Sequence, residues 1–197
     1  LPTSGRGAQG SEPFSGFWYP EWKGGTNGGG ALKHYDDVFN GQQPKAVQWE
    51  KQNHERAANS ANAGWAGHCN GWAASAQRHR EPQNDVTKTL SDGTQVTFSK
   101  NDIKALLAEV YMTAHAVFIG GQRCGTATEA CKIAQPENRS DPTKLDEYED
   151  VNPATFHVAL ANWVGKQKHA ILFDQKNAKE VWNYPIYGYS VTVTPLA

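Results

Sequence analysis

Residues 64–76 read GWAGHCNGWAASA and place a single cysteine, Cys69, between a glycine-containing turn and a run of small residues. Glycine is common in tight turns and alanine favours helices, so we expect a helix that begins at Cys69 or Asn70 and ends at His79. The unpaired amides at a helix start carry partial positive charge, which favours the thiolate form of a cysteine placed there. The stretch therefore predicts a cysteine nucleophile. The alternative is a small, buried apolar cysteine.

The other cysteines support this assignment. The chain has three cysteines, an odd number that fits one disulfide and one thiol outside it. Cys124 and Cys131 bound the short loop CGTATEAC, and a disulfide across it would stabilise the fold by about 2–3 kcal/mol. We therefore pair Cys124 with Cys131 and keep Cys69 as the reactive thiol.

Composition excludes several classes of protein. At 197 residues the chain fits one catalytic domain over residues 1–197, which can bury roughly 70% of its unfolded surface. The net charge of −1 provides no excess of positive charge to bind nucleic acid, so a nucleic-acid-binding protein is disfavoured. The mean hydropathy is −0.68, and no apolar run reaches the roughly 20 residues of a membrane span, so we expect a protein that is not integral to a membrane. The proposed disulfide and a glycosylation sequon at Asn138 favour a secreted, extracellular protein, and the start at Leu1 without an initiator methionine fits a mature product.

Periodicity outside the cysteine stretch predicts an α+β fold. Residues 1–30, rich in glycine and aromatic side chains, are expected to form an extended arm. Apolar residues at three-to-four spacing after the cap at Ser99 predict a helix over 100–118. The region 119–152 has little periodicity and is expected to be a long loop. Alternating or continuous apolar runs predict strands over 95–98, 155–161, 170–174 and 184–194.

A cysteine nucleophile needs a base and a group that orients the base. Among the seven histidines, His34, His54 and His79 are expected to be solvated, His115 to pack within its helix, and His68 to point away from the cysteine that follows it. His157 and His169 remain, both at predicted strands, and Asp174 ends the predicted apolar strand that follows the strand of His157. Two adjacent antiparallel strands would place Asp174 beside His157. We therefore predict a catalytic triad of Cys69, His157 and Asp174.

The order of these three residues resembles that of papain-like cysteine enzymes, in which a helical half carries the cysteine and a β half carries the histidine. In the papain peptidases the cysteine immediately precedes Trp-Ala, whereas here Asn70 and Gly71 separate Cys69 from Trp72. A papain-type peptidase is therefore not the nearest match.

A closer resemblance lies near the C-terminus. Residues 181–191 read VWNYPIYGYSV and resemble the peptide elicitor segment of the secreted oomycete transglutaminases, V-W-N-Q-P-V-x-G-[FY]-x-V, with differences that include Tyr184. Residues 67–73 (GHCNGWA) and 150–158 (DVNPATFHV) are similar to the nucleophile and histidine segments of that family, which also has bacterial members. Three motifs in order identify the chain as a member of the elicitor-type transglutaminases.

The resemblance implies acyl transfer between proteins that bear glutamine and lysine side chains. Cys69 would form a thioester with a glutamine, and His157, held by Asp174, would act as general base and acid. Asn62 or Asn70 would assist the Cys69 amide in stabilising the oxyanion, and Trp65 and Trp72 would line the acyl tunnel. For the two tryptophans, packing beside the helix is an equal alternative.

The sequence is also compatible with other functions. A thiol deamidase or peptidase would use the same triad, and a secreted elicitor or binding module would use none. The sequence requires no cofactor, and no cysteine and histidine set for zinc remains once Cys124 and Cys131 are paired, so no metal ligand is assigned. The acidic run over 146–150 is a possible calcium site or a solvated face. We expect a monomer.

Overall fold

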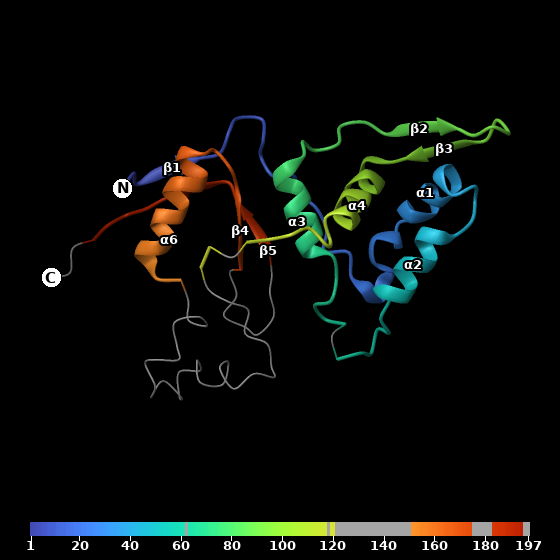
Figure 1. Cartoon of the computed structure of the whole chain (residues 1–197), viewed down its shortest axis with the longest axis horizontal. Helices are drawn as coiled ribbons and strands as arrows, with labels where there is room; N and C mark the ends of the chain where they lie inside the picture. The colour runs from blue at the N-terminus through green and yellow to red at the C-terminus, as the bar shows by residue number, and fades with distance from the viewer. Residues whose placement is uncertain (62, 118, 121–150, 175–182, 195–197) are drawn as a thin grey trace. The chain divides into compact units, whose positions relative to one another are not determined.

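A computed structural model of the chain describes residues 1–61, 63–117, 119–120, 151–174 and 183–194. The chain divides into two compact units: a central unit, Pro13–Ala114, and a terminal unit that combines Leu1–Glu12 with His115–Ala197. Each unit contains helical segments and at least one two-stranded antiparallel sheet, so the predicted α+β class is confirmed (Figure 1). Within the described ranges, no helix has the length and apolar character that crossing a membrane requires. The single catalytic domain stays a prediction.

The central unit is mainly helical. Its elements are, in chain order, the short 3-10 helices η1 (Glu21–Lys23) and η2 (Gly25–Asn27), the helices α1 (Ala31–Phe39), α2 (Lys45–Asn53) and α3 (Cys69–Arg78), the strands β2 (Val86–Thr89) and β3 (Gln95–Phe98), and the helix α4 (Lys100–Val110). Strands β2 and β3 form an antiparallel hairpin in which Val86 lies opposite Phe98. The predictions of a helix from Cys69 and of a strand over 95–98 are confirmed.

Helices α3 and α4 pack closely because small residues meet at their interface (Figure 1). Ala73 and Ala76 of α3 and Ala105 and Ala108 of α4 are all buried. Gly71 makes the closest approach, since a Cβ at this position would overlap the carbonyl oxygen of Ala108. The glycine is therefore required by packing, because side chains in a close-packed interior leave no space for an added carbon.

Helix α4 begins as predicted and ends earlier. Ser99 and Asp102 form a reciprocal capping box, with the Asp102 amide donating to the Ser99 hydroxyl at 3.1 Å and the Ser99 amide donating to the Asp102 carboxylate at 2.8 Å. The helix ends at Val110 rather than near residue 118. At this end the Met112 amide donates to the Glu109 carbonyl at 3.1 Å, a tighter turn than that of an α-helix.

Residues 1–30, expected to form an extended arm, are divided between the two units. Only β1 (Ser4–Arg6) forms a strand there, and the residues from Pro13 onward belong to the central unit. Phe14 is buried, and Pro20 pairs with Gly67 as an isolated antiparallel bridge. This bridge joins the N-terminal segment to the turn that precedes Cys69.

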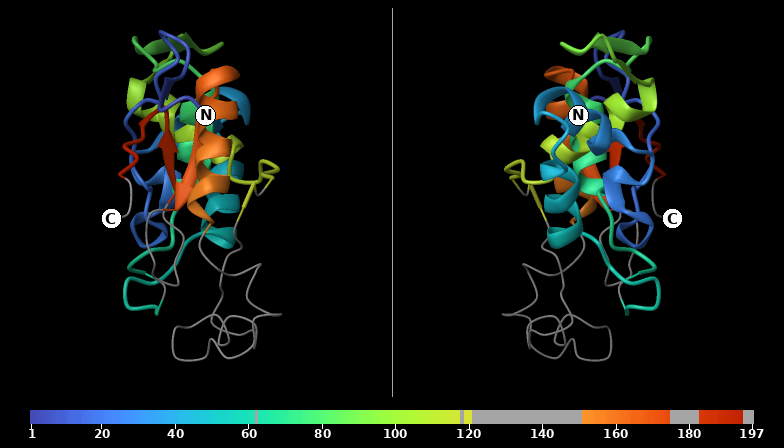
Figure 2. Two further views of the ribbon diagram at one scale, coloured as in Figure 1. Left: turned by 90° about the vertical axis from the view of Figure 1, so that its left-hand side faces the viewer. Right: turned by 90° about the vertical axis from the view of Figure 1, so that its right-hand side faces the viewer.

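The terminal unit consists of a helix and two small sheets. Strand β1 pairs with β6 (Gly188–Ser190), so segments near the two ends of the chain lie side by side (Figure 2). Strand β4 (Ile171–Asp174) pairs with β5 (Asn183–Ile186). Helix α6 (Pro153–Leu160) continues into a π-helical segment, η4 (Ala161–Lys166). The predicted strand over 170–174 is confirmed as β4, and the predicted strand over 184–194 is divided into β5 and β6.

The predicted strand over 155–161 is wrong, because these residues belong to α6 and η4. The Asn152 side chain caps the helix by accepting a hydrogen bond from the Ala154 amide at 2.9 Å, and Pro153 occupies the first turn. Asparagine followed by proline is a common helix start, since proline needs no amide partner there. These local signals outweigh the strand preference of Phe156 and Val158.

Candidate functional site

Cys69 is the first residue of α3, and its side chain is half-buried. Backbone hydrogen bonds fix the turn before it. The His68 amide donates to the Trp18 carbonyl at 2.7 Å, and the Trp72 amide donates to the His68 carbonyl at 2.9 Å. The first amides of α3 are therefore positioned at the cysteine, where their partial positive charge favours an oxyanion that forms beside it.

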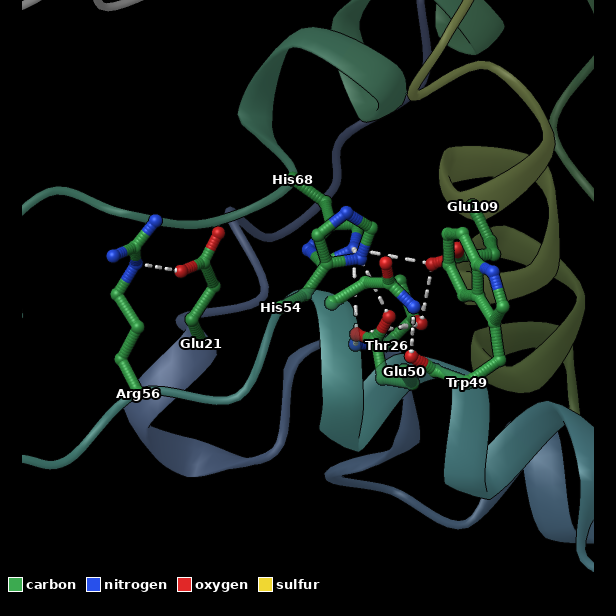
Figure 3. A network of polar contacts seen from close by, with 9 residues as sticks. Glu21, Thr26, Trp49, Glu50, His54, Arg56, His68 and Glu109 are labelled. Carbon is green, nitrogen blue, oxygen red and sulfur yellow. Dashed lines mark hydrogen bonds and ion pairs between the residues drawn. The ribbon is translucent and has the colours of Figure 1, made fainter.

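The residue before the nucleophile, His68, is part of a group of polar side chains that we name the His68 cluster: Glu50, His54, His68 and Glu109 (Figure 3). Four ligand atoms, one from each residue, all lie within 4.8 Å of one another. The Nε2 atom of His68 is 3.3 Å from His54 Nδ1, 3.3 Å from Glu50 Oε1 and 3.1 Å from Glu109 Oε2. The Nδ1 atom of His54 is also 2.8 Å from Glu50 Oε2. The cluster joins the end of α2, the start of α3 and the last turn of α4.

The two carboxylates of the cluster are held in place by η2. The Thr26 amide donates to Glu50 Oε1 at 3.0 Å, and the Thr26 hydroxyl donates to Glu109 Oε2 at 2.8 Å. The backbone of η2 lies directly against the cluster, since a Cβ at Gly25 would overlap Glu50 Oε1. Gly25 also has a φ of +56°, which favours glycine. These contacts fix the carboxylate oxygens that face His68.

The electrostatics of the cluster follow from its buried opposite charges. Burial alone would lower the pKa of His68, but hydrogen bonds and charge interactions with Glu109 and Glu50 raise this pKa to about 9. Burial would raise the pKa of Glu50, and its hydrogen bonds with His68, His54 and the Thr26 amide lower this pKa to about 2. Without another cation, the cluster is an imidazolium held between carboxylates.

This arrangement predicts a pH dependence of stability in the presence of a chelator. Because the folded state raises the pKa of His68 from 6.5 to about 9, the stabilisation is complete below pH 6.5 and is lost as the pH rises to 9. We expect the free energy of unfolding in urea to fall by about 2–3 kcal/mol over this interval.

The matched variant for this measurement is Glu109→Gln, which removes one of the two carboxylates that raise the pKa of His68. In this variant, the free energy of unfolding should change less with pH than it does in the wild type. A wild-type stability that is constant from pH 6.5 to 9, or an equal slope in the variant, would contradict the assigned charge state.

Of the predicted substrate and oxyanion residues in the central unit, Asn70 and Trp72 have clear packing roles. The Asn70 side-chain amide donates to the Met112 carbonyl at 3.2 Å and so joins α3 to the turn that follows α4. The Trp72 indole packs against Gly16, where a Cβ would overlap the ring. Trp65 is half-buried, and Asn62 lies outside the described residues. Their oxyanion and acyl-tunnel roles stay predictions.

His157 and Asp174 both belong to the terminal unit, but not to adjacent paired strands. His157 lies on α6, and Asp174 is the last residue of β4, opposite Asn183 of β5. The strand pairing that would set His157 beside Asp174 is therefore wrong. The Nε2 atom of His157 lies 2.7 Å from the Pro2 carbonyl, a partner that the sequence does not reveal. The catalytic triad stays a prediction.

Two other sequence predictions concern residues outside the described part of the chain. These are the disulfide between Cys124 and Cys131 and the possible calcium site over 146–150. Both stay predictions.

Sequence reasoning missed most of the His68 cluster. His54 was expected to be solvated and is instead half-buried against Glu50, and Glu109 was not among the predicted site residues. One local signal was present, because Glu50 and His54 are four residues apart and so share a face of α2. The contacts with His68 and Glu109 come from distant segments and have no such signal.

These features describe an α+β protein whose half-buried cysteine begins a helix beside a buried cluster of histidine and glutamate. The chain matches the family described as transglutaminase elicitor over residues 43–196, a range that contains Cys69, the His68 cluster and His157. The chain belongs to the transglutaminase elicitor family. No curated protein and no solved structure matches it.

Proposed function

We propose that the chain is a secreted protein-glutamine γ-glutamyltransferase that joins glutamine and lysine side chains through a thioester on Cys69. The observation that carries this proposal is the position of Cys69, half-buried at the first residue of α3, in a chain of the transglutaminase elicitor family. The proposed architecture is papain-like, with the cysteine in a helical half and His157 and Asp174 in the other half.

In the first half of the proposed reaction, His157 takes the proton of the Cys69 thiol, and the thiolate attacks the side-chain carbonyl carbon of a glutamine. The oxyanion that forms is stabilised by the amides at the start of α3. When this intermediate collapses, the bond between carbon and nitrogen breaks, and His157 returns the proton to the leaving ammonia. A thioester between Cys69 and the substrate remains.

In the second half, a lysine amine attacks the thioester carbonyl and displaces the Cys69 thiolate. His157 accepts the amine proton and passes it to the thiolate, which restores the thiol and leaves an isopeptide bond. Water in place of the amine would give glutamate. Selection of the amine therefore requires limited access of water, the role proposed for Trp65 and Trp72.

The hydrogen bond of His157 determines which ring nitrogen can act as the base. A carbonyl oxygen only accepts hydrogen bonds, so the contact with Pro2 requires a proton on Nε2 of His157. In the neutral ring the lone pair is then on Nδ1. We therefore assign proton transfer to Nδ1, with the Pro2 carbonyl as the group that orients the ring in this tautomer.

To test the proposal, the purified full chain is incubated with a labelled primary amine and a glutamine-rich protein. Incorporation of the label into that protein and release of ammonia are then measured. We expect label in the protein and release of ammonia, both rising with enzyme concentration. Ammonia without label would identify a deamidase. Neither signal, together with no cleavage of the protein, would indicate a binding module without catalysis.

A further inference from the structure

We propose that the His68 cluster binds one divalent transition-metal ion of the zinc type, through His68 Nε2, His54 Nδ1 and one carboxylate oxygen each from Glu50 and Glu109. This inference does not rest on the proposed transfer reaction, because it concerns residues that hold the start of α3 and not the reacting groups. It also differs from the possible calcium site over 146–150.

The distances from His68 Nε2 to the other ligand atoms are close to the edges of a tetrahedral site. Zinc lies about 2.0–2.2 Å from imidazole nitrogen and carboxylate oxygen, which sets the edges of the tetrahedron at about 3.3–3.6 Å. His68 Nε2 lies 3.1–3.3 Å from a ligand atom of each of the other three residues. The four side chains point toward one another in Figure 3. All four ligand atoms lie within 4.8 Å of one another, so the side chains would close around an ion at their centre.

Hydrogen bonding alone does not explain why three polar atoms surround the Nε2 atom of His68. His68 Nε2 carries at most one proton, yet it faces one nitrogen and two carboxylate oxygens at 3.1–3.3 Å. In the imidazolium form, His68 Nδ1 would also be a charged, buried donor with no hydrogen-bond partner among the described residues. A metal bound at Nε2 leaves a neutral ring, for which a buried donor without a partner costs less.

The donor set selects the class of ion. Calcium takes six to eight oxygen ligands, whereas two imidazole nitrogens with two carboxylates suit zinc and neighbouring divalent transition metals. The side chains of His68 and Glu50 are 0% and 1% exposed, so the site is largely shielded from water. Two carboxylates would balance the charge of a divalent ion.

The surroundings match those of a structural metal site. Ligating carboxylates are generally oriented by further hydrogen bonds, and here the Thr26 amide and hydroxyl supply them for Glu50 and Glu109. Four protein ligands complete a tetrahedral shell without water, as in closed structural zinc sites. Because the ligands come from α2 and the residue after it, the residue before α3, and the last turn of α4, the ion would fix the turn that precedes Cys69.

The first experiment measures metal in the full chain. After treatment with a chelator and dialysis, the protein is titrated with Zn²⁺. The amount of metal bound per chain is measured by elemental mass spectrometry. We expect about one ion per chain, and a rise in thermal midpoint of at least about 5 °C when free Zn²⁺ is about 100 times its Kd. Ca²⁺ at the same concentration should neither displace the zinc nor reproduce the rise.

Two variants test the assignment to these residues. His54→Gln and Glu109→Gln each remove one ligand from a partly exposed position and should weaken Zn²⁺ binding by about 100-fold or more. His79→Gln, an exposed histidine outside the cluster, should bind as the wild type does. The proposal is overturned by a wild-type chain that takes up no zinc, or by ligand variants that bind it with unchanged affinity. Circular dichroism of each variant verifies that it is folded.

Discussion

Replacing Cys69 with alanine is expected to lower the incorporation of labelled amine by at least about 1,000-fold, to the level of the reaction without enzyme. The reason is chemical, because no thioester can form without the thiol, and both halves of the transfer pass through it. Cys69 is half-buried, and alanine is a favourable helix residue, so the substitution should leave the fold intact. Initial rates of label uptake and ammonia release measure the loss.

A second pair of variants separates the proposed base from other histidines. His157→Gln should cause a loss of similar order, whereas His169→Gln, at an exposed position of the same unit, should retain wild-type activity. Thermal unfolding of each variant shows whether a loss of activity reflects a loss of fold. Substantial amine incorporation by folded Cys69→Ala protein would refute the thioester mechanism.

Where the sequence predicted secondary structure well, the deciding signals were local. The helix from Cys69 follows from a glycine-containing turn and small residues, and the start of α4 follows from the capping pair of Ser99 and Asp102. Helix α6 was not predicted, because its aromatic and β-branched residues favour a strand, whereas the cap at Asn152 and the following Pro153 favour a helix. Because His157 lies on this helix, strand pairing does not place Asp174 beside it.

The polar site was less predictable because its members are far apart in the chain. His68 and Glu109 are brought together by the packing of α3 on α4, and Glu50 reaches them through the contact of α2 with η2. Only the spacing of Glu50 and His54 could have been read locally. The position of Cys69 is different, because it depends on the single turn that begins α3.

The same contact between α3 and α4 makes Gly71→Ala the substitution with the largest expected effect on stability. Alanine in a helix is normally favoured over glycine by about 1 kcal/mol. Here the added Cβ would overlap the Ala108 carbonyl oxygen and lie 3.1 Å from the Met112 amide nitrogen, both backbone atoms that cannot rotate away. Helices α3 and α4 would have to separate, so we expect a loss of about 3 kcal/mol in the free energy of unfolding.

Gly29→Ala is the matched control, because a Cβ at this exposed glycine would meet no atom within 4 Å. It should change the free energy of unfolding by no more than about 0.5 kcal/mol. Urea unfolding of both variants and the wild type measures the difference. A Gly71→Ala protein as stable as the wild type would show that α3 and α4 are not packed at this distance. If the loss is found, Zn²⁺ affinity should fall with it, because His68 and Glu109 approach one another only while the two helices stay in contact.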